Sequence, residues 1–165
     1  MLKASVLFFA LACVGLTSAQ DQYTQAGLIK YKSPVGFKRN DSRVPKGRIG
    51  FFAPMQENYS SNVMITITDS GDYTAAKLGK ETTDYTRAND KTVTIVKESP
   101  IKLSGKDAYS IEMNRKLPNG MVVGQQQILA IHKGKAVIFT FSTLKKNYTT
   151  VKPKFTASLK TVAWN

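Results

Sequence analysis

Hydrophobic and polar residues alternate along several segments of this chain, with the period of two that is typical of half-buried β-strands. The alternation is clear from Val63 to Thr68, from Ala108 to Arg115 and from Ala136 to Thr143. Turn residues at Leu117–Gly120 and Lys133–Lys135 separate the last strands, so residues 107–143 predict a three-stranded antiparallel meander. The full set of strands that the pattern predicts covers residues 29–31, 47–52, 63–68, 92–97, 108–115, 121–132 and 136–143.

A period near 3.6 replaces this alternation in two places, and each predicts a helix. The first runs roughly from Tyr73 to Arg87, with an inner face that we expect to contain Ala75, Leu78, Thr82 and Tyr85. Gly79 has a low helix propensity, so this helix must depend on packing.

The second helix lies near the C-terminus, where the apolar stripe consists of Val151, Phe155, Leu159 and Val162. We expect Thr149 or Thr150 to cap it and Pro153 to lie in its first turn. Trp164 follows the helix and is expected to close one edge of the core.

Strands with one helix in the middle and another at the end predict an α+β fold, an antiparallel β-sheet flanked by helices. The alternative that the pattern leaves open is a curled sheet wrapped around a single long helix, as in cone-shaped or cystatin-like folds.

The first nineteen residues have the three parts of a secretory signal peptide. Lys3 gives a positive start, Val6–Leu16 is apolar, and Thr17–Ala19 supplies small residues for cleavage. The apolar run is shorter than the roughly 20 residues that span a bilayer, so we expect no transmembrane segment. The chain then divides into a signal peptide (1–19), a flexible polar tail (20–28) and one α+β domain (29–165), exported to the periplasm or secreted.

The single cysteine, Cys13, lies inside this leader. A processed chain would therefore have no disulfide, thiolate nucleophile or cysteine metal ligand. The alternative reading is a lipoprotein signal, in which Cys13 is lipidated and becomes the new N-terminus.

Several short motifs along the chain resemble the PsbP-like family. They are Tyr31–Phe37 with its Pro and Gly-aromatic pair, Phe51–Pro54, Asn62–Ile67, the Leu103–Tyr109 turn, Lys135–Ser142 and Tyr148–Leu159. The resemblance spans residues 29–162 and implies an α/β/α sandwich around an antiparallel sheet, in an exported protein of bacterial type. It also implies a protein that acts by docking onto other proteins. No functional residue carries over, because fold alone does not define function.

The charge is strongly basic, with 24 Lys and Arg against 11 Asp and Glu. Two groups concentrate it: a loop group (Lys38, Arg39, Arg43, Lys46 and Arg48) and a C-terminal group (Lys145, Lys146, Lys152, Lys154 and Lys160). If they form one basic face, it would bind an acidic protein or an anionic envelope component. Export and the lack of a nucleic-acid motif argue against nucleic acid. The alternative is that these lysines and arginines are only a solvated surface.

Catalytic residues are scarce. His132 is the only histidine and borders a turn, and no nucleophile elbow, zinc motif or phosphate loop is present. Asp69 and Asp72 flank a glycine and could hold a hard cation, although a plain turn explains them as well. We therefore expect no catalytic site, no metal and no cofactor. A hydrolase with a carboxylate pair is the remaining enzymatic alternative.

Three consecutive glutamines, Gln125–Gln127, stand in a predicted strand, where at least one amide must face inward. Gln125 and Gln127 could line a cleft, which makes a binding module for a sugar, peptide or lipid the runner-up function. Asn40, Asn58 and Asn147 begin N-x-[ST] sequons, which would be glycan acceptors only in a eukaryotic secretory protein.

Overall fold

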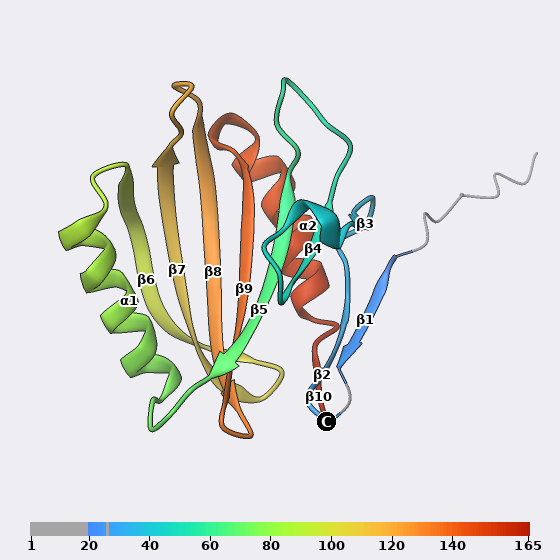
Figure 1. Ribbon diagram of the computed structural model, residues 1–165, viewed down its shortest axis with the longest axis vertical. Coiled ribbons are helices and arrows are strands. Elements are labelled where there is room, and N and C mark those ends of the chain that lie inside the picture. Colours follow the sequence, from blue (N-terminus) through green and yellow to red (C-terminus); the bar gives the residue numbers. More distant parts are fainter. Residues whose placement is uncertain (1–19, 26) are drawn as a thin grey trace, which may run out of the picture.

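The computed structural model describes residues 20–25 and 27–165. The predicted signal peptide and Cys13 lie outside these residues. Among these residues, two α-helices and ten strands form an α+β fold (Figure 1). The elements are β1 (Gln22–Gln25), β2 (Ile29–Lys32), β3 (Lys38–Arg39), β4 (Arg48–Phe52), β5 (Asn62–Asp69), α1 (Ala75–Asn89), β6 (Val93–Leu103), β7 (Lys106–Lys116), β8 (Val122–His132), β9 (Lys135–Leu144), α2 (Tyr148–Leu159) and β10 (Ala163–Trp164).

Seven strands form one antiparallel sheet in the order β3-β4-β5-β9-β8-β7-β6. The meander predicted for residues 107–143 is confirmed as β7, β8 and β9. β5 pairs with β9, so the strands from the first half of the chain join the large sheet beside β9, the last strand of the meander. β9 is the central strand and is buried on both faces, so it takes part in the packing on each side of the sheet.

A second, three-stranded sheet has the order β1-β2-β10. The expectation of a loose tail is wrong for Gln22–Gln25, which form β1 and pair with β2. The Tyr23 side chain is buried, and the backbone N–H of Asp21 donates to the Ser33 hydroxyl at 3.0 Å. The composition of this segment is polar because only one of its strand residues faces the core, while the others face solvent.

The two helices lie on opposite faces of the large sheet. α1 packs on the face of β7 that presents Tyr109, and α2 packs on the face of β8 that presents Gly124. In Figure 1, α1 lies beside β6 at one end of the sheet, whereas α2 runs behind β5. The sandwich predicted from the sequence is thus present, with the small sheet as an addition.

α2 closes the main hydrophobic core. Phe155 is fully buried and its ring stacks on that of Phe141, with 5.1 Å between centroids. The Tyr31 hydroxyl and the Ser158 hydroxyl share a buried hydrogen bond of 2.8 Å, which ties β2 to this helix. The core continues through β5 and β9 to the small sheet, where Ile29 is fully buried.

The predicted start of α2 is wrong by a few residues. A 3-10 turn at Lys145–Asn147 leads directly into the helix, and Asn147, whose side chain makes no capping bond, occupies the cap position. Pro153 therefore lies inside the helix and not in its first turn. The 3-10 turn replaces a side-chain cap, since its tighter bonds satisfy backbone groups at the helix end.

The inner face of α1 differs from the prediction. Its buried residues are Ala75, Gly79 and Thr83, whereas Tyr85 is 70% exposed. A Cβ at Gly79 would lie 2.2 Å from the Tyr109 ring, so the helix can approach the sheet only because this position has no side chain. The prediction followed residue size, but here the smallest residue marks the contact.

The outer edges of the large sheet are irregular. β3 has only two residues, and β6, at the other end, contains a bulge between Ile95 and Lys97 and a proline at Pro100. No helix among the described residues is long and apolar enough to cross a membrane.

Candidate functional site

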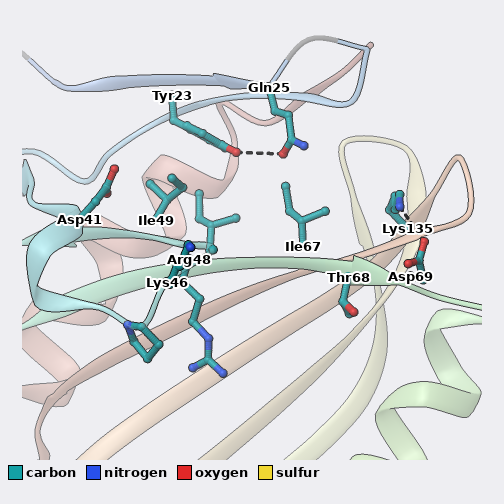
Figure 2. Close-up of a pocket in the computed structure, with 13 residues that line it drawn as sticks. Tyr23, Gln25, Asp41, Lys46, Arg48, Ile49, Ile67, Thr68, Asp69 and Lys135 are labelled. Carbon is teal, nitrogen blue, oxygen red and sulfur yellow. Dashed lines mark hydrogen bonds and ion pairs between the residues drawn. The ribbon is translucent and has the colours of Figure 1, made fainter.

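The largest of the cavities found among the described residues, a cleft of about 760 Å³, lies between β1 and the paired strands β4 and β5. Figure 2 shows Tyr23 and Gln25 on one side, facing Ile49 and Ile67 across it. The Tyr23 hydroxyl donates to Gln25 at 3.0 Å, which fixes the wall formed by β1. Each wall is carried by a different sheet, so the cleft depends on how the small sheet packs on the large one.

The cleft exists because β5 extends beyond the end of β4, its neighbour in the sheet. The pairing of β4 with β5 ends at Arg48 opposite Thr66, whereas β5 continues to Asp69. Beyond Thr66 this side of β5 has no partner strand, and the cleft wraps around the free edge. Side chains alternate across a strand, so Arg48 and Thr68 point away from Ile49 and Ile67 (Figure 2).

The charge around this cleft is positive. Asp41 pairs with Arg39 at 2.6 Å, and Asp69 pairs with Lys135 at 2.6 Å, so both carboxylates are neutralised within the protein. The hydrogen bond from Arg39 lowers the pKa of Asp41, although its partial burial opposes this effect. Within residues 20–25 and 27–165, no carboxylate lies at ion-pair distance from Lys46 or Arg48.

Two of the five residues of the loop group line the cleft, Lys46 and Arg48. Arg39 is held in its ion pair with Asp41, and the Arg43 guanidinium lies over the Phe52 ring at 4.2 Å from the centroid. Lys38 is exposed on β3. These five residues are close together in the sequence, but their side chains make different contacts.

The C-terminal group is divided among other surfaces. Lys145 and Lys146 line a cavity of about 400 Å³ with Met121 and Val122, and Lys146 pairs with Glu57. Lys152 pairs with Glu112 at 2.8 Å, while Lys154 and Lys160 are exposed. No cavity found among the described residues contains members of both basic groups. A single basic face therefore stays a prediction.

The Glu112 carboxylate is held by two groups from α2. Lys152 donates to it at 2.8 Å, and the Tyr148 hydroxyl donates at 3.0 Å. Burial works against ionisation, but these two hydrogen bonds outweigh it and lower the pKa of Glu112. Burial and the nearby carboxylate both raise the pKa of Tyr148. The arrangement stabilises a charged glutamate and holds α2 on β7.

His132 contacts the C-terminal residues of the chain. It ends β8, half-buried, with its ring 5.3 Å from that of Trp164 and Nε2 at 2.8 Å from the backbone oxygen of Asn165. The Trp164 indole donates to the Leu103 carbonyl at 3.0 Å, which closes this edge of the core as predicted. In the part of the chain that the structure describes, no three His, Cys, Asp or Glu side chains gather at metal-binding distance.

The glutamine run has one inward member, Gln126, which is 8% exposed and lines a cavity beside α2. Gln125 instead bonds to Arg115 and Ser142 on the other face of β8. The predicted cleft residues Gln125 and Gln127 line none of the cavities found among the described residues. Strand alternation required that either Gln126 or its two neighbours face α2, but the sequence alone did not say which.

No protein family model and no curated protein matches this chain. Solved structures do. The solution structure of cyanobacterial PsbP from Synechocystis sp. PCC 6803 matches over 95% of this chain and 98% of its own, with a TM-score of 0.63 and 16% identity.

LpqN, described as involved in cell envelope biogenesis of Mycobacterium tuberculosis, matches over 89% of this chain and 91% of its own, with a TM-score of 0.64 and 16% identity. The Pseudomonas aeruginosa protein PA94, described as a putative regulator of unknown function, covers 86% and 94%, with a TM-score of 0.63 and 14% identity. The fold of this chain is therefore PsbP-like, as the sequence motifs indicated.

Proposed function

We propose that this protein is an exported, non-catalytic binding domain that docks onto an acidic partner protein or an anionic envelope component. The docking site is the part of this cleft that wraps around the free edge of β5, with Lys46 and Arg48 as its main contacts. The observation that carries the proposal is that these two cations border the largest cleft without any carboxylate partner among the described residues. An acidic group that enters the cleft would meet cations that are not already neutralised.

Export rests on the signal peptide read from residues 1–19. A role at the envelope is supported by LpqN, a protein of the same fold whose description places it in cell envelope biogenesis. Neither resemblance names a partner, so the partner is defined by its chemistry, a surface rich in carboxylate or phosphate.

The rest of the basic charge has a smaller part in this proposal. Eight of the eleven carboxylates form ion pairs within the protein, so the excess lysines and arginines are spread over many surfaces. Lys38, Arg39 and Arg43 adjoin the cleft along the chain and would extend the docking site. Lys145, Lys146, Lys152 and Lys154 would contribute only if the partner reaches around the molecule.

The test is a pull-down from the native envelope or secreted fraction at low and high salt, with three charge-reversed variants. Lys46→Glu with Arg48→Glu removes the proposed contacts, and Lys145→Glu with Lys146→Glu tests the C-terminal group. Lys91→Glu with Lys116→Glu is the matched control, because both side chains are exposed and lie away from the cleft.

We expect one partner that is captured at low salt and lost at high salt, because exposed charges are screened. The Lys46/Arg48 variant should lose it, and the Lys91/Lys116 control should keep it. Equal loss in both variants would mean that overall charge, and not the cleft, binds the partner. Turnover of a substrate by the pure protein would overturn the non-catalytic assignment.

A further inference from the structure

A groove runs along α2 on the side away from the basic cleft. It consists of two adjoining cavities, of about 440 and 600 Å³, that share Thr156 and Lys160. Its floor is the part of β6, β7 and β8 that α2 leaves uncovered, and it has no residue in common with the cleft between β1 and β4–β5.

Aliphatic side chains line one half of this groove. Ile101 and Leu103 come from β6, Ile128 from β8 and Leu159 from α2. No charged group interrupts the four, whereas Lys102 and Lys160 stand at the rim. Lys102 is paired with Asp107 at 2.6 Å, but no carboxylate in the described part of the chain lies at ion-pair distance from Lys160.

Gln126 is the buried polar residue in this half of the groove, beside the exposed Ser104 and Thr156, and its amide makes only part of its possible hydrogen bonds. Its Nε2 donates to the Ser110 hydroxyl at 3.0 Å, while its Oε1 is buried and accepts from no described group. An unpaired buried carbonyl oxygen costs about 1–3 kcal/mol. Reversing the amide would only exchange the unpaired oxygen for an unpaired N–H, so one pole lacks a partner in either orientation.

A hydroxyl group can bond to the unpaired end of the Gln126 amide in either orientation of the amide, because a hydroxyl both donates and accepts hydrogen bonds. A ligand hydroxyl can donate to Gln126 Oε1 once the amide turns toward the groove, because Gln126 lines the cavity while Oε1 itself is covered by neighbouring atoms. The aliphatic lining favours a hydrocarbon chain as the rest of the ligand. Lys160 favours a negatively charged group close to the ligand hydroxyl.

We propose that the groove between α2 and β6–β8 binds a single-chain anionic amphiphile with a hydroxyl in its headgroup. The hydrocarbon chain lies along Ile101, Leu103, Ile128 and Leu159. The headgroup hydroxyl bonds to Gln126, and the anionic group pairs with Lys160. This site is independent of the proposed docking function, because it uses a different surface.

The test is a titration of the purified protein with lauroyl lysophosphatidylglycerol below its micelle concentration. Trp164 is the only tryptophan and its indole bonds to the Leu103 carbonyl, so its fluorescence reports on the groove. We expect saturable binding of one amphiphile, confirmed by calorimetry. Glycerol 3-phosphate lacks the chain and lauroyl lysophosphatidylcholine lacks the net charge and the headgroup hydroxyls, so both should bind at least tenfold more weakly.

Two variants separate the groove from general adhesion. Gln126→Leu removes the unpaired oxygen but also the hydrogen bond to Ser110, so its two effects on stability oppose each other, while the affinity should fall about tenfold. Gln127→Leu makes the same change on the opposite face of β8 and should bind normally. If Gln126→Leu does not fold, Lys160→Glu replaces it in the test. Lys160 is exposed, and its reversal should weaken binding to a similar extent.

Equal binding by Gln126→Leu and Gln127→Leu, or by all three probes, would overturn the proposal, as would the absence of saturable binding. The Lys46→Glu/Arg48→Glu variant should keep its amphiphile affinity. Retained binding there, together with a lost partner in the pull-down, would show that the two sites act separately.

Discussion

Each helix packs on the sheet through a glycine and an aromatic ring that fills the space above it. Which of the two residues lies on the helix and which on the sheet is exchanged between α1 and α2. In α1, Gly79 lies on the helix and the ring that fills its space, Tyr109, comes from β7. In α2, the ring belongs to the helix, Tyr148, and the space is provided by Gly124 on β8. Each arrangement allows a helix to lie close to a strand, because an aromatic ring occupies the place of a missing side chain.

A different glutamate takes part in the packing of each helix on the sheet. Glu98 accepts from the Tyr109 hydroxyl at 3.0 Å and pairs with Arg87 of α1 at 2.9 Å. Glu112 accepts from the Tyr148 hydroxyl at 3.0 Å and pairs with Lys152 of α2 at 2.8 Å. What differs is the hydrophobic core beneath. α2 covers the main core, whereas α1 covers a smaller cluster of Tyr109, Ile111, Met113 and Leu129. The polar contacts position a helix, and the core decides how much stability it contributes.

The largest effect should come from emptying the core under α2. Phe155→Ala should reduce the free energy of unfolding by about 3–5 kcal/mol, because it leaves a cavity beside Phe141. Leu78→Ala is the counterpart in α1 and should cost less, about 2 kcal/mol, since Leu78 is only half-buried. Urea unfolding monitored by circular dichroism measures both. Equal costs would contradict the difference between the two cores.

The next effect concerns the exchanged glycines. A Cβ would lie 2.2 Å from Tyr109 in Gly79→Ala and 2.5 Å from Tyr148 in Gly124→Ala, so each should destabilise the fold by about 1–3 kcal/mol. In the background of Tyr109→Ala the sign should reverse for Gly79→Ala, because alanine is favoured over glycine in a helix by about 1 kcal/mol. If Gly79→Ala stabilises the protein with Tyr109 in place, the close contact does not hold α1 on the sheet.

A smaller effect should appear as a pH dependence of stability. Burial opposes ionisation of both glutamates, yet their hydrogen bonds and ion pairs lower the pKa of Glu98 and of Glu112. A lowered carboxyl pKa stabilises the fold above the unfolded value of about 4.3, and this contribution is lost as the pH falls through the folded value.

Glu98→Gln and Glu112→Gln should each lose less stability than the wild type between about pH 5 and pH 3 in urea titrations. The change should be larger for Glu112→Gln, because Lys152 is less exposed than Arg87 and its ion pair is screened less. A variant that retains the wild-type slope would show that its glutamate has no part in the pH response.

The smallest effect should come from Tyr85, the residue of α1 that size alone would place inside. Tyr85→Ser should change the free energy of unfolding by no more than about 0.5 kcal/mol, since Tyr85 is 70% exposed. A loss above about 2 kcal/mol in chemical unfolding would return Tyr85 to the inner face and overturn the assignment of Gly79 and Thr83 as the contact.

The period-two pattern of the strands was enough to predict most of the fold from the sequence. The alternation in β5, β7 and β9 predicted these strands, because one face of each packs on apolar groups. The turns on either side of β8 predicted the meander of β7, β8 and β9. The pattern did not predict β1, since its core contact is made by Tyr23 alone. It also did not predict the inner face of α1, where contact requires the absence of a side chain at Gly79.

The candidate sites depend on long-range geometry to a greater extent. Lys46 and Arg48 were named from the sequence as basic residues, but the cleft they border exists only because β5 continues past β4. The separation of Lys145 from this cleft follows from the sheet order, which one sequence does not reveal. Gln126 is a similar case, because the run of glutamines indicated a buried amide but not its position.

The irregular edges of the large sheet affect how the protein behaves at high concentration. An exposed edge strand can recruit the same strand from another molecule and start an ordered aggregate. β6 resists such recruitment, because Pro100 has no N–H to offer and the bulge at Ile95/Lys97 twists the strand out of register. Pro100→Val should therefore leave the monomer folded but shorten the lag before fibrils form.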